Sequence, residues 1–91
     1  MNRISVYSTR ICPYCVMAKR LLSAKGVAYD DLRIDQDEAA RAEMQERAPA
    51  SRTVPQIFIG DTHVGGFDEL AALDRAGKLD AMLAPYIDGQ S

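Results

Sequence analysis

The chain has 91 residues, 11 basic and 13 acidic, with 47% apolar and 26% charged side chains. This composition is typical of one globular domain, residues 1–91, and excludes a disordered chain. A net charge of −2 gives no electrostatic reason to expect a nucleic-acid partner. No apolar run approaches the roughly 20 residues of a transmembrane helix, and the first ten residues lack the apolar stretch of a signal peptide. We therefore expect a cytoplasmic protein without a membrane partner.

The charges are unevenly distributed along the chain. Five cations and no carboxylate precede Asp30, whereas seven carboxylates lie between Asp30 and Arg47. The five cations are Arg3, Arg10, Lys19, Arg20 and Lys25. Because both cysteines lie in the basic part, we expect a positive field around them; a solvated helix face would explain the same pattern equally well.

The first third of the chain predicts a strand, a helix and a second strand. Alternation over residues 4–7 indicates the first strand, and residues 8–11 are expected to form a loop. A helix follows from about Pro13 to Lys25, and Gly26 is a typical residue to end it. The predicted inner face of this helix holds Ala18, Leu21 and Leu22. The second strand is predicted at Tyr29–Leu32.

A second helix is predicted to end at about Arg47, before Pro49. Its start is open between a capping box of Asp35 with Glu38 and an N-cap at Asp37. Its apolar face is thin. That face consists chiefly of Ala39, Ala40 and Met44.

A hairpin and two further helices are predicted in the last part of the chain. Strands at residues 56–59 and 62–64 flank the two-residue turn Gly60–Asp61. Asp68 is predicted as the N-cap of a third helix, which Gly77 ends. Leu70 and Leu73 are expected on the inner face of that helix. The last, short helix carries Leu79, Met82 and Leu83 and is extended by Tyr86.

The predicted order is β-α-β-α-β-β-α-α. A strand–helix–strand unit requires parallel strands with a right-handed crossover, whereas the last two strands form an antiparallel hairpin. The result is a four-stranded mixed sheet flanked by helices on both faces. This α/β architecture is the thioredoxin-like fold.

The chemistry of the chain centres on its two cysteines, Cys12 and Cys15. A disulfide over so short a loop would restrict the unfolded chain very little, so the pair serves reactivity. With Pro13 as first helical residue, Cys12 is the N-cap and accepts hydrogen bonds from the N–H groups of Tyr14 and Cys15. These donors and the helix dipole stabilise a Cys12 thiolate. Cys15, one turn on and more buried, is placed to resolve a mixed disulfide.

Other interpretations of the cysteines are weaker. Structural zinc needs four ligands, and the chain adds only His63 and carboxylates. Two unreactive core cysteines are disfavoured to the same degree as zinc, and a cysteine hydrolase lacks a base near the loop. His63 itself is expected to be an exposed strand residue.

Three segments resemble the glutaredoxin family, in particular its small bacterial dithiol members. They are Cys12-Pro13-Tyr14-Cys15, the segment TVPQIFIG at residues 53–60, and GGFDEL at residues 65–70. Their order and spacing match over nearly the whole chain. The resemblance implies a glutathione-disulfide oxidoreductase that reduces protein–glutathione mixed disulfides and protein disulfides. It implies glutathione as co-substrate and no metal.

The resemblance also implies a glutathione site. The Val54–Pro55 bond would be cis and face Cys12, so that the N–H and C=O of Val54 pair with glutathione. Asp68 would bind the γ-glutamyl ammonium of glutathione, and the N–H groups at Phe67–Asp68 would bind the γ-glutamyl carboxylate. A plain helix cap is the alternative role of Asp68. The residues implied are Arg10, Tyr14, Thr53, Val54, Pro55, Gly66, Phe67 and Asp68, with Tyr14 lining the groove and Gly66 allowing close approach.

The chain departs from the family pattern before the first cysteine. Thr9 stands where the family commonly has a lysine for the glycyl carboxylate of glutathione, with Arg10 as the neighbouring cation. Ile11 stands where a small polar residue is frequent. The residues that remain open for the glycyl carboxylate are Arg41, Ala42, Arg47 and Arg52.

Two other functions stay open. One is a redoxin reduced by thioredoxin reductase, which the absence of Trp and of a Cys-Gly-Pro-Cys motif disfavours. The other is a carrier of a [2Fe–2S] cluster ligated by Cys12 and glutathione, which Pro13 and the second thiol disfavour. The expected partners are glutathione and glutathionylated or disulfide-containing proteins, with ribonucleotide reductase as one candidate. A monomer is the default expectation.

Overall fold

Four strands form one mixed sheet in the computed structural model of the chain, which describes residues 3–87. The strands are β1 (Ile4–Ser8), β2 (Asp30–Arg33), β3 (Gln56–Ile59) and β4 (Thr62–Gly65). Their order is β2-β1-β3-β4; β1 runs parallel to β2, whereas the β1–β3 and β3–β4 pairs are antiparallel. The predicted thioredoxin-like architecture is confirmed.

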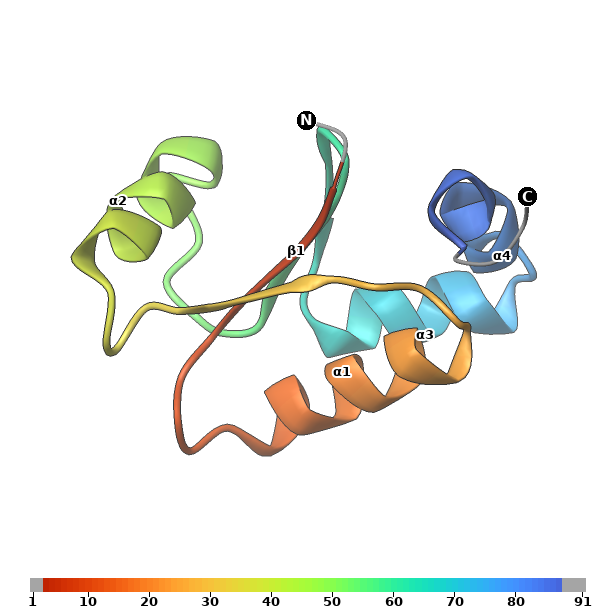
Figure 1. The fold of residues 1–91 in the computed structure, drawn as a ribbon, viewed down its shortest axis with the longest axis horizontal. Coiled ribbons are helices and arrows are strands. Elements are labelled where there is room, and N and C mark those ends of the chain that lie inside the picture. Colours follow the sequence, from red (N-terminus) through yellow and green to blue (C-terminus); the bar gives the residue numbers. More distant parts are fainter. Residues whose placement is uncertain (1–2, 88–91) are drawn as a thin grey trace.

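Helices cover both faces of this sheet (Figure 1). They are α1 (Pro13–Ala24), α2 (Glu38–Arg47), α3 (Phe67–Arg75) and α4 (Leu79–Leu83), followed by a 3-10 turn at Ala84–Tyr86. Figure 1 shows α2 on one side of β1 and the other three helices on the opposite side. The predicted extension of the last helix to Tyr86 is therefore a 3-10 turn.

The alternation of side chains along β1 and β3 builds two separate cores. Ile4 and Val6 point to the side of α1, α3 and α4, whereas Tyr7 points to α2. The larger core also holds Ala18, Leu22, Val27, Ile57, Ile59, Leu70, Leu79 and Leu83, with Leu21 and Leu73 packed against it. The core beneath α2 holds Tyr7, Ile34, Ala40, Met44, Ala48 and Phe58. The sheet thus carries α1 and α3 on the same face.

The two first helices begin and end mostly as predicted. Gly26 follows α1 with a φ of +78°, a conformation that favours glycine. Of the two predicted starts of α2, Asp37 is the N-cap; its carboxylate accepts from the N–H groups of Ala39 and Ala40 at 2.9 and 3.2 Å. Ala39 was wrongly predicted as inward. It is exposed, because the buried face of α2 continues in steps of four residues from Ala40 to Ala48.

The structure corrects the predicted start of α3. Gly66, not Asp68, is the N-cap, and the Glu69 carboxylate reaches back to accept the N–H of Gly66 at 2.7 Å. Asp68 is therefore the second residue of the helix, and its side chain is exposed. Smaller shifts occur in the strands. β1 extends to Ser8 and β2 begins at Asp30, because the two pair from Ser5↔Asp30 to Ser8↔Arg33.

The expectation of a positive field around the cysteines is only partly right. Because β2 lies beside β1, its carboxylates meet the basic segment: Lys19 Nζ lies 2.7 Å from Asp31, and Arg3 pairs with Asp30 at 3.0 Å. Burial raises the pKa of Asp31, but the hydrogen bonds from Lys19 and Ser8 outweigh it and lower that pKa below its usual value. Among residues 3–87, no ion pair neutralises Arg10 or Arg20.

A polar network ties α2 to the sheet. The Tyr7 hydroxyl donates to the Glu43 carboxylate and accepts from Arg47 Nη1 at 3.0 Å. Arg47 also donates to the carbonyl of Gly60 at 2.9 Å, and its guanidinium lies 3.8 Å from the centre of the Phe58 ring. Burial, and then the hydrogen bond to Glu43, raise the pKa of Tyr7 above its usual value. Helix α2 is therefore held by polar contacts as well as by its small apolar face.

Asp35 fixes the loop that leads from β1 to α1. Its carboxylate accepts the backbone N–H of Arg10 at 2.9 Å and pairs with the Arg33 guanidinium at 2.8 Å. The hydrogen bond from Arg33 is the main cause that lowers the pKa of Asp35 to about 2. The segment just before Cys12 is thus anchored to the end of β2.

We expect Tyr7→Phe to lower the free energy of unfolding by about 1–3 kcal/mol, because Glu43 and Arg47 lose a buried partner. Urea denaturation measures this change. Tyr29→Phe is the matched control, since the Tyr29 hydroxyl makes no hydrogen bond within the described residues; we expect a change below about 0.5 kcal/mol there. Equal losses in both variants would contradict the role of the network.

The low pKa of Asp35 predicts a pH-dependent contribution to stability. The folded-state pKa is about 2 and the reference value 3.8, so the stabilisation is fully present above about pH 4 and is lost as the pH falls to 2. The difference in Tm between wild type and Asp35→Asn should therefore shrink over this interval. A difference that stays constant from pH 6 to pH 2 would contradict the assignment.

Candidate active site

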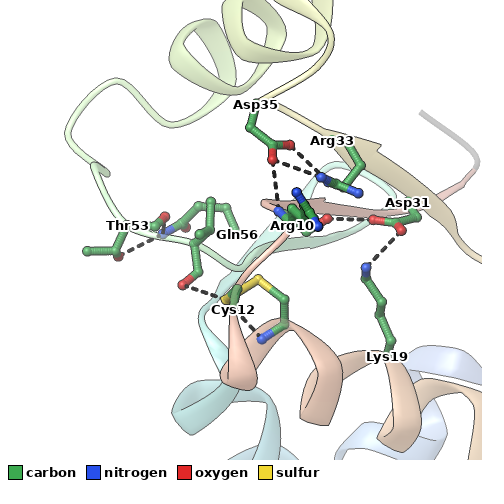
Figure 2. Close-up of a disulfide and its surroundings, with 11 residues drawn as sticks. Arg10, Cys12, Lys19, Asp31, Arg33, Asp35, Thr53 and Gln56 are labelled. Carbon is green, nitrogen blue, oxygen red and sulfur yellow. Dashed lines mark hydrogen bonds and ion pairs between the residues drawn. A yellow bond between two sulfur atoms is a disulfide. The ribbon is translucent and has the colours of Figure 1, made fainter.

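Cys12 and Cys15 form a disulfide at the N-terminus of α1 (Figure 2). Cys12 is the N-cap, Pro13 the first helical residue, and the N–H of Cys15 donates to Cys12 Sγ at 3.1 Å. The predicted cap is confirmed. The predicted second donor is wrong: within the described residues the sulfur accepts from Cys15 and not from Tyr14, since a cap atom pairs with the second or the third N–H of the helix.

The two sulfur atoms differ in accessibility. Cys15 is 1% exposed and lies in the core, whereas Cys12 is half-buried. A thiol or disulfide that approaches from solvent therefore reaches Cys12 first. This asymmetry fits an attacking role for Cys12 and a resolving role for Cys15.

The segment before β3 faces Cys12. The Val54–Pro55 peptide bond is cis, and the carbonyl oxygen of Val54 lies 3.7 Å from Cys12 Sγ. Gln56 Nε2 donates to the carbonyl of Thr53 at 2.9 Å, as Figure 2 shows. Within residues 3–87 the N–H of Val54 has no hydrogen-bond partner, so it is available to a ligand.

A groove of about 350 Å³ borders this segment. It is lined by Tyr14, Thr53, Val54, Pro55, Gly66, Phe67, Asp68 and Glu69. Of the eight residues that the resemblance implies for glutathione, this lining contains all but Arg10. The groove thus joins three segments that are far apart in the sequence, from α1, the loop before β3 and the start of α3.

Glu69 is the lining residue that the sequence analysis missed. Besides accepting the N–H of Gly66, its carboxylate packs against the preceding glycine: a Cβ at Gly65, where φ is +113°, would lie 2.9 Å from Glu69 Oε1. A glutamate three residues after an N-cap is a known capping pattern, and that signal would have identified it. Glu69 therefore lines the groove together with Asp68 and holds the glycine pair before α3.

The structure distinguishes between the arginines that the sequence left as candidates for binding the glycyl carboxylate of glutathione. Arg47 ends α2, and its guanidinium is already bound to the Tyr7 hydroxyl and the Gly60 carbonyl. Arg41 and Arg52 line a second pocket of about 420 Å³, and Arg41 Nε donates to the carbonyl of Ile34 at 3.3 Å. Because Arg52 directly precedes Thr53, the two pockets are neighbours along the chain.

His63 is the exposed strand residue that was predicted. Its ring stacks on Phe58 with a centroid distance of 4.6 Å, and its Nε2 lies 2.6 Å from Gln56 Oε1. Residues 3–87 contain no group of three or more His, Cys, Asp and Glu side chains that could hold a metal ion. In the same part of the chain, no helix is long and apolar enough to cross a bilayer.

Curated proteins with similar sequences are bacterial glutaredoxins. The glutaredoxin of Pseudomonas aeruginosa is 52% identical over 84 residues, which cover 92% of this chain and 99% of that protein. Glutaredoxin 3 of Escherichia coli is 49% identical over 83 residues, covering 91% and 99%.

Solved structures give the same result. A buckwheat glutaredoxin–glutathione complex superposes with a TM-score of 0.80 at 36% identity, covering 91% of this chain and 77% of that one. The dithiolic glutaredoxin of Trypanosoma brucei brucei has a TM-score of 0.78 at 40% identity, covering 90% and 87%. The glutaredoxin family model matches residues 4–64. With Cys12 capping α1, bonded to Cys15 and facing a cis-proline loop, the chain belongs to the glutaredoxin family.

Proposed function

We propose that this protein is a glutathione-dependent reductase of protein–glutathione mixed disulfides and protein disulfides. The observation that carries the proposal is the position of Cys12 Sγ, which caps α1 and lies 3.7 Å from the Val54 carbonyl at the edge of the groove. The cytoplasm, where glutathione keeps thiols reduced, is the compartment we propose for this activity.

The first route needs Cys12 alone. The Cys12 thiolate attacks the glutathione sulfur of a mixed disulfide; the Cys12–glutathione bond forms, and the protein thiolate leaves and takes up a proton. A second glutathione thiolate then attacks the bound glutathione sulfur. Glutathione disulfide leaves, and Cys12 returns as a thiolate. The helix dipole and the Cys15 N–H stabilise the negative sulfur at both stages.

The second route also uses Cys15. The Cys12 thiolate attacks a protein disulfide, one protein thiol leaves, and Cys15 attacks Cys12 to release the second. The Cys12–Cys15 disulfide forms, which is the state in Figure 2. Two glutathione molecules then reduce it and leave as glutathione disulfide.

The groove supports a specific pose for glutathione. The N–H and C=O of Val54 pair with its cysteine residue, in the manner of an added strand. At the N-terminus of α3, the N–H groups of Phe67 and Asp68 receive the γ-glutamyl carboxylate, and the Asp68 carboxylate receives the ammonium. Glu69 occupies the N–H of Gly66, so the ligand is directed to the next two N–H groups.

The opposite end of glutathione needs a cation. Arg41 and Arg52 have no ion pair within the described residues and line the neighbouring pocket. We assign the glycyl carboxylate to these two arginines, since Thr9 has no charge and Arg10 lies outside the groove lining. The guanidinium geometry suits a carboxylate.

Substitution of each cysteine separates the two routes. We expect Cys12→Ser to abolish reduction of a glutathionylated peptide, whereas Cys15→Ser retains it, because only Cys12 attacks in the first route. Consumption of NADPH in a coupled assay with glutathione and glutathione reductase measures turnover. Persistent turnover by Cys12→Ser would contradict the assignment. Turnover of wild type only with thioredoxin reductase would favour the alternative redoxin.

Asp68→Asn tests the proposed ammonium contact. We expect KM for glutathione to rise roughly fivefold at unchanged kcat, as for the loss of an exposed ion pair worth about 1 kcal/mol. For N-acetylated glutathione, which lacks the ammonium, the same variant should leave KM unchanged. Glu46→Gln removes an exposed carboxylate from α2 and is the matched control. A fivefold rise with both forms of glutathione would contradict the contact.

A further inference from the structure

The large apolar side chains that are exposed on this protein gather around Cys12. They are Ile11, Tyr14, Val16 and Met17, with exposed fractions of 85, 58, 45 and 43%. Elsewhere in the described part of the chain, large apolar side chains are buried or half-buried. Single exposed apolar residues are common, but a cluster of this kind marks an interaction surface. We call these four residues the active-site patch.

The patch continues the glutathione groove on the side of α1. Tyr14 belongs to both surfaces: it lines the groove and stacks on Phe67 with a centroid distance of 6.4 Å. Met17 lies one turn beyond Tyr14 on the helix surface, and Ile11 directly precedes Cys12. A polypeptide whose cysteine is joined to Cys12 therefore passes next to the patch.

Two cations without ion pairs border the patch. Arg10 precedes Ile11, and Arg20 follows Val16 and Met17 by one helical turn. Other cations on or near α1 are neutralised: Lys19 pairs with Asp31, and Lys25 with Asp74. Within residues 3–87 the pairing thus leaves positive charge at the edges of the apolar surface. An apolar centre with a positive rim is complementary to an apolar segment that carries a carboxylate.

We propose that the active-site patch docks protein substrates whose reacting cysteine is flanked by a large apolar residue and a carboxylate. The apolar side chain packs on Ile11, Tyr14 and Met17, and the carboxylate meets Arg10 or Arg20. The inference rests on the proposed function only for the attack by Cys12. To the proposed function, the inference adds the class of polypeptide substrate that Cys12 attacks fastest.

The test uses peptides and no glutathione. Each peptide carries one cysteine activated as a mixed disulfide with thionitrobenzoate. The Cys12 thiolate attacks the peptide sulfur; the Cys12–peptide disulfide forms, and the coloured thionitrobenzoate anion leaves. The Cys15→Ser protein stops the reaction at this stage. Three peptides differ only beside the cysteine: Leu with Glu, Leu with Lys, and Ser with Glu.

The expected result is a rate order set by both flanking residues. In the Cys15→Ser protein, at low ionic strength, we expect the Leu–Glu peptide to react roughly fivefold faster than each of the other two. Adding Ile11→Ser should remove the preference for Leu over Ser. Adding Arg10→Glu and Arg20→Glu together should reverse the preference for Glu over Lys. Ratios between peptides cancel any change in the intrinsic reactivity of Cys12.

Arg75→Glu is the matched control for charge. Arg75 is exposed at the last position of α3 and belongs neither to the active-site patch nor to the two cations that border it, and we expect both ratios to remain as in the Cys15→Ser protein. Equal rate constants for all peptides, or ratios unaffected by Ile11→Ser and by the double variant Arg10→Glu/Arg20→Glu, would overturn the docking surface. A wild-type dimer that dissociates in Ile11→Ser would assign the patch to a second copy of the chain and also overturn it.

The two proposals fail in different experiments. Absence of turnover with glutathione, together with the expected peptide ratios, would overturn the proposed function and retain the docking surface. Normal turnover with glutathione, together with equal peptide rates, would retain the proposed function and overturn the docking surface. Absence of thionitrobenzoate release by the Cys15→Ser protein would overturn the attacking role of Cys12. Both the proposed function and the docking surface would then fail.

Discussion

The hydrogen bond from the N–H of Cys15 to Cys12 Sγ is the contact on which the site depends. It places one sulfur at the positive end of the α1 dipole while the other remains in the core. The cap has a fixed position only because α1 is held on the sheet, where Ala18 and Leu22 are completely buried against β1 and β3. Packing of a helix therefore controls the position of a reactive atom, which explains why a chain this small needs a well-formed core beneath its active site.

The order of the strands brings the rest of the site to that sulfur. Because β3 pairs with β1, the loop before β3 ends beside the N-terminus of α1, where the Val54 carbonyl meets Cys12. The hairpin of β3 and β4 then returns the chain so that α3 lies on the same face as α1 and starts at the groove. A backbone edge, a helix N-terminus and the reactive sulfur thus converge, and each makes a different chemical contact in the proposed pose of glutathione.

Charge pairing divides the surface around the cysteines. Carboxylates of β2 neutralise the cations that face the sheet, and Asp35 holds the loop in front of Cys12 through its backbone. Arg10 and Arg20 stay unpaired within the described residues, next to the exposed apolar side chains. The proposed result is a site with two sides. In this proposal, glutathione occupies the groove toward α3, and the protein substrate lies on the patch toward α1, with Cys12 between them.

The sequence by itself determined the elements, the fold class and the reactive pair, because apolar periodicity, glycine stops and the CPYC motif are local signals. It misplaced two local details: Gly66 caps α3 because Glu69 reaches back to it, and Ala39 is exposed because the buried positions of α2 and its C-cap are Ala40, Met44 and Ala48. Only the tertiary structure withdrew Arg47 from the site and neutralised Lys19, since burial and ion pairing join residues that are distant in the chain. The chemistry of Cys12 thus depends on four consecutive residues, whereas the residues that surround it are brought together by the order of the strands in the sheet.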